Sequence, residues 1–357
     1  MKHHVEMENL DYIQIHPTTL YSKKPGRRFL VSESVRGEGA LLYDKNGQRF
    51  TNELQPRDLL SQKIFAQMEK DGTEFVWEDM RPLGEKTILE HFPHIYEQCV
   101  EEGFDPRKEP IPVVPAQHYF MGGIWVDYEL MTSIKGLFAI GECNFSDHGA
   151  NRLGASALMQ GLADGYFVLP YTIQNYLADQ ITVPRFSTDL PEFAAAEKAV
   201  QEKIDWMMNI KGKKSVDSIH KELGHIMWEY VGMGRTAEGL KEGLKKLKEV
   251  RKEFEKELFI PGDKEGMNVE LDKAIRLYDF ITMGELVAYD ALNRNESCGG
   301  HFREEYQTEE GEAKRDDENY FYVACWEYQG SDEKEPVLLK EPLVYEAIKV
   351  QTRNYKS

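Results

Sequence analysis

Gly149-Ala150-Asn151-Arg152-Leu153-Gly154-Ala155-Ser156-Ala157-Leu158 is the most informative stretch of this chain, and Gly141-Glu142 stands shortly before it. The glycine-rich turn lets backbone N–H groups come close to a flat ligand, and the small residues after it predict the start of a helix. The first turn of a helix favours negative charge nearby. Arg152 adds a planar, two-pronged donor that suits a carboxylate. The stretch therefore predicts a binding site at a helix start.

Composition places the chain among globular proteins of more than one domain. It has 357 residues, of which 41% are hydrophobic and 30% are charged, enough for two or three domains with a large core. The formal net charge of −18 argues against a nucleic-acid partner. The four cysteines form no CxxC pair, which favours reduced thiols over a disulfide framework or a zinc site. No apolar stretch approaches the roughly 20 residues of a membrane span, so direct membrane insertion is not expected.

The first half of the chain reads as mixed α and β structure. Residues 12–15 predict a strand that runs into His16-Pro17-Thr18. The turn Asp44-Lys45-Asn46-Gly47 suits a hairpin, and residues 136–141 predict a buried strand. His91 and His94 have HxxH spacing, but no third ligand of comparable spacing lies nearby, so no metal site is predicted.

From about residue 190 the pattern becomes helical. Apolar residues at three- and four-residue spacing follow Ser215, which is a suitable N-cap, and the same spacing follows Thr236; a further helix follows around Leu271. These helices predict an antiparallel bundle. After residue 296 the segment Tyr320–Tyr328 predicts one strand between acidic loops.

Five polar motifs outside the bundle stand in a recognisable order. Each residue alone is compatible with an ordinary turn or surface position. Together they resemble the flavoprotein family of succinate dehydrogenase and fumarate reductase, which also includes L-aspartate oxidase. The residues are His16 in His-Pro-Thr, Ser32, Glu33 and Arg36 in Ser-Glu-Ser-Val-Arg-Gly-Glu-Gly, Arg57 in Pro-Arg-Asp, His118 in His-Tyr-Phe-Met-Gly-Gly, and Arg152.

The resemblance implies FAD as cofactor and a dicarboxylate as substrate. One substrate carboxylate would be held by His118 and Arg152, and the other by His16 and Ser32. Hydride would pass between flavin N5 and one substrate carbon, and a proton would be added at the other. The cofactor-binding residues implied by the family are Glu142, Asn151, Ser156, Ala157 and Leu158.

Arg57 resembles the proton donor of the family. Because the pKa of an arginine exceeds about 12, it can serve as an acid only if a relay reprotonates it at once. Glu33 and Arg36, three residues apart, match that relay. The resemblance thus assigns Arg57, Glu33 and Arg36 to catalysis.

Two features depart from the family. The GxGxxG dinucleotide fingerprint is absent, so we expect a truncated chain in which the N-terminal half of the FAD-binding domain is missing. Residues 1 to about 115 look more like L-aspartate oxidase. Residues from about 122 to 357 look like the flavoprotein subunit of Bacteroides-type bacteria, which suggests a splice near residue 120.

The expected fold is an α+β multidomain chain. Residues 1–17 and 116–180 would form the remainder of a Rossmann-like FAD-binding domain, 18–115 an α/β capping domain, 190–295 a helical bundle, and 296–357 a small C-terminal α+β segment. The resemblance implies an iron–sulfur subunit as partner and a cytoplasmic location, free or peripheral on the inner membrane through partner subunits. Two alternatives stay open: L-aspartate oxidase, which oxidises aspartate to iminoaspartate, and an inactive flavoprotein fragment that still docks on a partner.

Overall fold

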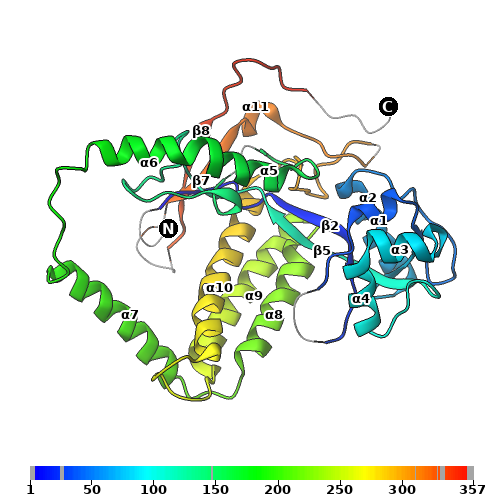
Figure 1. Ribbon diagram of the computed structural model, residues 1–357, viewed down its shortest axis with the longest axis horizontal. Helices are drawn as coiled ribbons and strands as arrows, with labels where there is room; N and C mark the ends of the chain where they lie inside the picture. The colour runs from blue at the N-terminus through cyan, green and yellow to red at the C-terminus, as the bar shows by residue number, and fades with distance from the viewer. Residues whose placement is uncertain are drawn as a thin grey trace. The chain divides into compact units, whose positions relative to one another are not determined.

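The computed structural model describes residues 5–24, 28–145, 148–309, 311–327, 329 and 334–351. Contacts divide the chain into two compact units (Figure 1). The larger unit comprises Met1–Tyr12 and Met121–Ser357, and the smaller unit comprises Ile13–Phe120. Each unit holds a four-stranded antiparallel sheet together with helices, which confirms the expected α+β fold class.

The sheet of the smaller unit has the strand order β2-β5-β4-β3. Its strands are β2 (Ile13–Leu20), β5 (Ile111–Phe120), β4 (Val76–Asp79) and β3 (Leu41–Tyr43). The predicted strand at residues 12–15 forms as the start of β2. The register of β2 against β5 shifts between His16 and Thr19, around Pro17, which has no N–H to give to a ladder.

Helices cover this sheet and close its core. They are α1 (Glu33–Gly37), α2 (Arg57–Asp71), η1 (Arg81–Leu83), α3 (Glu85–His91) and α4 (Pro93–Glu101). Leu60 and Ile64 of α2 are fully buried in a cluster that includes Leu42 and Val113 of the strands. The predicted hairpin turn is confirmed: the carboxylate of Asp44 accepts the N–H groups of Asn46 and Gln48, both at 2.8 Å.

The sheet of the larger unit joins distant parts of the sequence in the order β6-β1-β7-β8. Its strands are β6 (Gly123–Ile124), β1 (Met7–Glu8), β7 (Tyr322–Glu327) and β8 (Val337–Pro342). The predicted strand near residue 320 therefore forms as β7. It pairs with β1 at Glu8 and Cys325, so the C-terminal region shares a sheet with the first described residues.

The buried strand predicted for residues 136–141 does not form. This segment makes turns and a single bridge between Met131 and Phe138, and the side chains of Leu137 and Ile140 are about two-fifths exposed. A strand is stable only beside a partner strand, and no strand of the described chain pairs with this segment. The segment ends in the short helix η2 (Gly141–Cys143).

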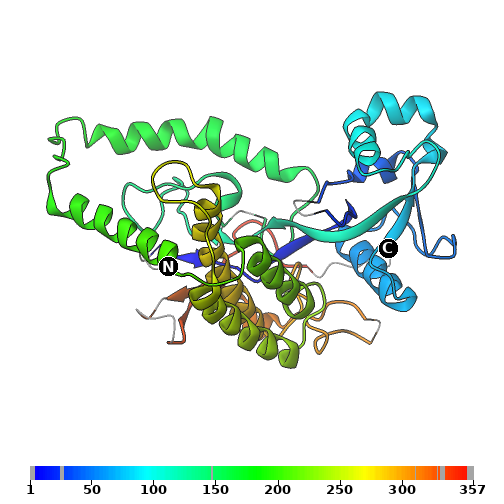
Figure 2. The ribbon, with the colours of Figure 1, turned by 90° about the horizontal axis from the view of Figure 1, so that it is seen from below.

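A long helical rod follows the glycine-rich turn (Figure 2). It is made of α5 (Ser156–Ala163), the π-helical turn η3 (Asp164–Val168) and α6 (Leu169–Ala178), and α7 (Pro191–Asn209) comes next. Large apolar side chains on this rod and in the turn after it face solvent, among them Leu158, Phe167 and Ile181 at 80%, 74% and 81% exposure.

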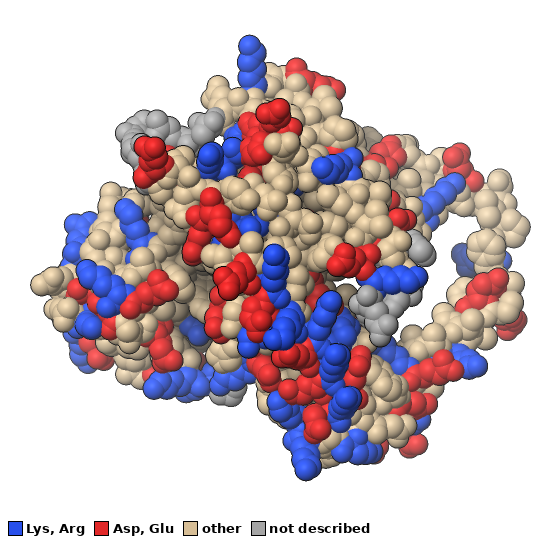
Figure 3. Space-filling view, turned by 180° about the vertical axis from the view of Figure 1, so that it is seen from behind, with Lys and Arg blue, Asp and Glu red and all other residues tan. Residues whose placement is uncertain are grey.

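The predicted bundle forms from three helices that lie side by side (Figure 2). They are α8 (Val216–Val231), α9 (Ala237–Glu257) and α10 (Val269–Asn293), and a short α11 (Asp317–Tyr320) follows. Ser215 caps α8 as predicted, and Thr236 caps α9; each accepts an N–H three residues on. Basic and acidic side chains intermix over the outer face of the bundle (Figure 3), which is typical of a solvated surface.

Candidate functional site

His16 and His118 are brought together by the pairing of β2 with β5 (Figure 1). Their ring centroids lie 5.1 Å apart with planes inclined by 60°. His16 is 2% exposed, and its Nδ1 lies 3.1 Å from the N of Thr18 and 3.0 Å from the O of Thr18. Burial lowers the pKa of His16 to about 3, and the nearby charges of Arg36, His118 and Arg57 add to the shift. The imidazole of His16 is therefore neutral at ordinary pH.

Arg57 and Glu33 form a close ion pair between two helix starts. Arg57 is the first residue of α2 and Glu33 is the first residue of α1. The Nε of Arg57 donates to Oε2 of Glu33 at 2.6 Å, and Nη2 lies at the same distance from that oxygen. A third contact runs from Nη1 of Arg57 to Oε1 of Gln14 at 3.3 Å. Two elements thus orient the guanidinium of Arg57.

Arg36 follows Glu33 by three residues on α1 and points into the smaller unit. Its side chain is 3% exposed, and Nη1 donates to the backbone O of Glu53 at 2.9 Å. Burial lowers the pKa of Arg36, and the carboxylates of Glu78 and Glu33 oppose that shift. In the described part of the chain, Nε and Nη2 of Arg36 make no hydrogen bond, which leaves two donors free.

Ser32 is the N-cap of α1. Its Oγ accepts the N–H of Ser34 at 3.2 Å, so the hydroxyl stands at the same helix start that carries Glu33. The smaller unit therefore carries six of the predicted residues on β2, on β5, on α1 with its N-cap, and at the first residue of α2. They are His16, Ser32, Glu33, Arg36, Arg57 and His118.

Sequence reasoning missed two residues near this group. Gln14 contacts Arg57, and Glu78 on β4 is fully buried with no hydrogen bond to either carboxyl oxygen among the described residues. Burial raises the pKa of Glu78 to about 7, although the charge of Arg36 acts against the shift. The sequence could have indicated the burial of Glu78, because side chains alternate between the two faces of a strand and Glu78 falls on the same inward face of β4 as Val76.

The remaining predicted residues belong to the larger unit. Arg152 is 6% exposed, and its Nη1 donates to the backbone O of Leu153 at 3.4 Å. Half-buried Asn151 precedes it in the turn. Helix α5 starts at Ser156, directly after Ala155 in a left-handed conformation with φ 62°.

The turn that carries Glu142 packs against α5. The N–H of Gly141 donates to the carboxylate of Asp164 at 3.2 Å, and a Cβ on Gly161 would lie 3.7 Å from the Cα of Gly141. Exposed Glu142 therefore lies on an element that packs against α5, the helix whose first residues are Ser156, Ala157 and Leu158. All five predicted cofactor-binding residues fall on this turn and helix or on the segment between them.

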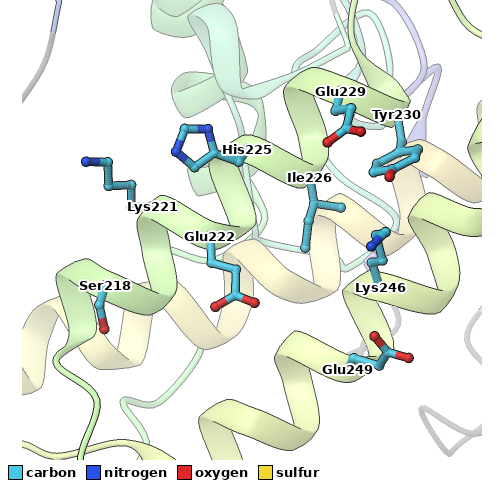
Figure 4. A pocket seen from close by; sticks show the side chains of 9 residues that line it. All are labelled: Ser218, Lys221, Glu222, His225, Ile226, Glu229, Tyr230, Lys246 and Glu249. Atoms are coloured by element: carbon cyan, nitrogen blue, oxygen red, sulfur yellow. The ribbon is translucent and has the colours of Figure 1, made fainter.

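A separate hollow lies on the bundle (Figure 4). It encloses about 400 Å³ between α8 and α9. Its lining mixes both signs of charge, and Lys246 lies over the ring of Tyr230 at 5.6 Å and within 3.9 Å of Glu242. None of the predicted site residues lines it. The lining residues are Ser218, Lys221, Glu222, His225, Ile226, Glu229, Tyr230, Lys246 and Glu249.

The described residues offer neither a metal cluster nor a helix that could span a bilayer. No group of three or more His, Cys, Asp or Glu side chains there has the geometry to hold a metal ion. Among the helices of the same residues, none has both the length and the apolar character of a bilayer span.

Comparison with known proteins identifies two family models on the chain. An FAD binding domain matches residues 2–158, and a fumarate reductase flavoprotein C-terminal domain matches residues 220–355. The fumarate reductase flavoprotein subunit of Escherichia coli is 34% identical over 350 residues, which are 90% of this chain and 55% of that protein. The L-aspartate oxidase of Clostridium perfringens is 49% identical over 164 residues, or 45% of this chain and 37% of that protein.

Solved structures agree with these matches. A quinol-fumarate reductase with menaquinol molecules superposes with a TM-score of 0.81 at 31% identity, over 99% of this chain and 62% of its own. Mycobacterium smegmatis Sdh1 in complex with UQ1 gives 0.76 at 28% identity, over 95% and 56%. The chain spans about half the length of the curated fumarate reductase subunits that it matches. It belongs to the FAD-binding flavoprotein family that contains the fumarate reductase and succinate dehydrogenase flavoproteins and L-aspartate oxidase.

Proposed function

We propose that this chain carries the substrate-binding and proton-relay residues of an FAD-dependent dicarboxylate oxidoreductase of the succinate dehydrogenase and fumarate reductase type. The observation that carries the proposal is the pairing of Arg57 with Glu33, with Arg36 three residues further on and buried. The side chain of Arg57 is 19% exposed and also contacts Gln14, and an isolated surface ion pair would need neither feature.

In this proposal four side chains bind the dicarboxylate. Arg152 and His118 hold one carboxylate, and His16 and Ser32 donate to the other. Because His16 is neutral, it can give a hydrogen bond without neutralising the charge of the substrate. In this proposal the hydrogen bonds from His16 and Ser32 twist the second carboxylate out of the plane of the substrate double bond. A twisted carboxylate is no longer conjugated with the double bond, so the double bond is easier to polarise.

Arg57 moves the proton. Its guanidinium gives a proton to a substrate carbon in the reductive direction and regains it from Glu33, which is hydrogen-bonded to it. Arg36 then restores the proton of Glu33, since both side chains extend from one turn of α1. Because an arginine is a very weak acid, with a pKa above about 12, it can give up a proton only where a neighbouring group returns one at once.

The exposed segment around η2 and α5 suits a flavin. The first turn of α5 offers N–H groups that no side-chain cap occupies, and Glu142 adds a carboxylate that can accept hydroxyl groups. Asn151, Ser156, Ala157 and Leu158 would hold the ring and Glu142 the sugar-like chain. When bound, the flavin accepts or supplies the hydride.

L-aspartate oxidase is the second candidate. The 49% identity to the Clostridium perfringens enzyme favours it over part of the chain. The same anion-binding residues would hold the two carboxylates of aspartate, but the enzyme would also need a partner for the amino group. A third candidate is an inactive chain that docks on an iron–sulfur subunit, which would place it at the cytoplasmic face of a membrane.

Absorption and substrate assays separate the three candidates. The purified chain is incubated with FAD, desalted and scanned between 350 and 500 nm, a window set at roughly the range of flavin absorption. If the chain retains flavin, and if fumarate reoxidises this flavin after it has been chemically reduced under anaerobic conditions, the proposal is supported. Reduction by aspartate but not by succinate supports L-aspartate oxidase. A colourless chain contradicts both enzyme assignments and supports the inactive fragment.

A further inference from the structure

The loop Cys298–His301, in the C-terminal region, touches the turn that carries Arg152. The N–H of Gly300 donates to the backbone O of Ala150 at 2.7 Å. A Cβ on Gly299 would lie 2.2 Å from the same oxygen and 2.6 Å from the Cβ of Ala150. Gly299 also has a φ of +56°, a conformation that favours glycine. The two segments are some 150 residues apart in sequence and pack backbone against backbone.

Two backbone hydrogen bonds between Cys298 and His301 close this loop. The N–H of Cys298 donates to the O of His301 at 2.8 Å, and the N–H of His301 donates back to the O of Cys298 at 3.0 Å. A pair of reciprocal backbone bonds holds Gly299 and Gly300 at the tip of a tight turn. The position of the tip is therefore set by whatever holds His301.

His301 is held by the bundle. Its side chain is completely buried, Nε2 lies 2.9 Å from the backbone O of Arg294, and Nδ1 lies 2.7 Å from Nη1 of Arg235. A carbonyl can only accept, so Nε2 carries the hydrogen and Nδ1 accepts from Arg235. Burial lowers the pKa of His301 to about 3, which agrees with this neutral form.

Arg235 connects this loop to the end of α8 and to the segment at Asp11. It is 1% exposed, and its Nε donates to the O of Val231 at the end of α8 at 3.0 Å. Its Nη1 also donates to the O of Asp11 at 2.9 Å. This buried guanidinium cannot move without breaking several hydrogen bonds. Each broken bond would leave a donor away from water and without a partner, which costs free energy.

We propose that His301 and Arg235 are positioning residues for Arg152, acting through the contact of Gly299 and Gly300 with Ala150. Neither touches the substrate. They hold the backbone of the turn so that the guanidinium of Arg152 stays at one place. The proposal rests on the proposed role of Arg152 in binding a carboxylate.

The test compares Gly299→Ala with Gly311→Ala in the full chain. Gly311 also has a positive φ, +80°, but the nearest atom to an added Cβ is the end of the Gln307 side chain at 3.6 Å. Both variants thus carry backbone strain, and only Gly299→Ala pushes on Ala150. Native-state trypsin cleavage after Arg152 is measured by mass spectrometry, relative to cleavage after exposed Arg185. Fumarate affinity is measured by calorimetry on the same samples.

We expect Gly299→Ala to raise the cleavage ratio about tenfold or more and to weaken fumarate binding, while Gly311→Ala changes neither. Equal ratios in the two variants overturn the proposal, whatever the affinities. If the wild-type chain binds no fumarate but the ratio rises in Gly299→Ala, the positioning contact is supported and the proposed function of Arg152 fails.

A second pair of variants covers the case in which Gly299→Ala does not fold. His301→Gln keeps an N–H for the O of Arg294 and an acceptor for Arg235, whereas His301→Ala keeps neither. We expect the cleavage ratio to stay near wild type in His301→Gln and to rise in His301→Ala. The same ratio in both variants would contradict the proposal, since a change in general stability would also move cleavage after Arg185.

Discussion

At the residue scale, the proton path depends on how one guanidinium is oriented. Arg57 bonds to Glu33 through Nε and Nη2 and to Gln14 through Nη1, so all three nitrogens have a partner. Such a planar fork cannot be copied by an ammonium group. Arginine at this position is therefore a requirement of geometry as much as of charge.

We expect Arg57→Lys to retain the fold and to lose about 10²–10⁴-fold in fumarate reduction, because lysine cannot keep both contacts and the proton position. The rate is measured with flavin-loaded chain and a reduced dye. Arg276→Lys, at an exposed pair with Asp272, is the control and should be unaffected. A rate unchanged in Arg57→Lys would remove Arg57 from the proton step.

The burial of Glu78 makes the stability of the folded chain depend on pH. Its pKa is raised to about 7 in the folded chain from an ordinary value of 4.5. Between these two pH values the folded chain binds the proton and the unfolded chain has lost it. Stability therefore falls as pH rises from about 4.5 to about 7, by up to ~3 kcal/mol, and is level above that range.

We expect Glu78→Gln to abolish this slope, since the amide has no proton to lose. Hydrogen exchange of peptides that cover β4 is compared at pH 5 and pH 8, after correction for the intrinsic exchange rates. Glu90→Gln, at an exposed position, serves as control and should keep the wild-type slope. Identical slopes in wild type and Glu78→Gln would show that the carboxyl is ionised in the folded chain throughout.

At the element scale, the sequence predicts a helix correctly where contacts between residues close in sequence stabilise that helix. Ser215 and Thr236 cap the helices predicted from their apolar spacing, because capping is a contact between residues three apart. Residues 136–141 have the composition of a strand, but strands depend on hydrogen bonds to a distant neighbour. That neighbour could not be read from the segment itself, and the prediction was wrong.

Removing a cap tests this account. The hydroxyl of Thr236 accepts the N–H of Gly239 at 3.0 Å. We expect Thr236→Ala to lower the free energy of unfolding by about 1 kcal/mol, and Thr236→Ser to restore most of it. Urea denaturation followed by circular dichroism measures both variants. Equal stability of the alanine and serine variants would mean that the hydroxyl does not cap α9 in solution.

At the scale of the whole molecule, the rod of α5, η3 and α6 exposes large apolar side chains. Phe167 on the rod is 74% exposed and Ile181, in the turn just after it, is 81% exposed, in a chain that spans about half the length of its curated relatives. Apolar surface of this kind is seldom left in contact with water. We therefore expect the isolated chain to bind apolar dyes and to self-associate.

The double change Phe167→Ser with Ile181→Ser should reduce dye fluorescence several-fold and shift sedimentation toward the monomer, without lowering the melting temperature. Gln174→Ser, an exposed change on the same rod, is the control. Dye binding that persists in the double variant would place the exposed apolar surface elsewhere in the chain.

The amino-acid sequence by itself determined the elements and residues whose causes are local. Helix caps, the turn at Asp44 and the spacing of Glu33 and Arg36 on one helix follow from neighbours within four residues. The order of the motifs was also sufficient to indicate the flavoprotein family.

Only the tertiary structure decided which distant groups meet. The pairing of β2 with β5 places His16 beside His118, the packing of β4 buries Glu78, and the loop at Gly299 rests on Ala150. These contacts join residues about 100 to 150 positions apart or depend on burial by several elements at once, and no local propensity encodes them. Their physical cause is the close packing of backbone and side chains in the folded core.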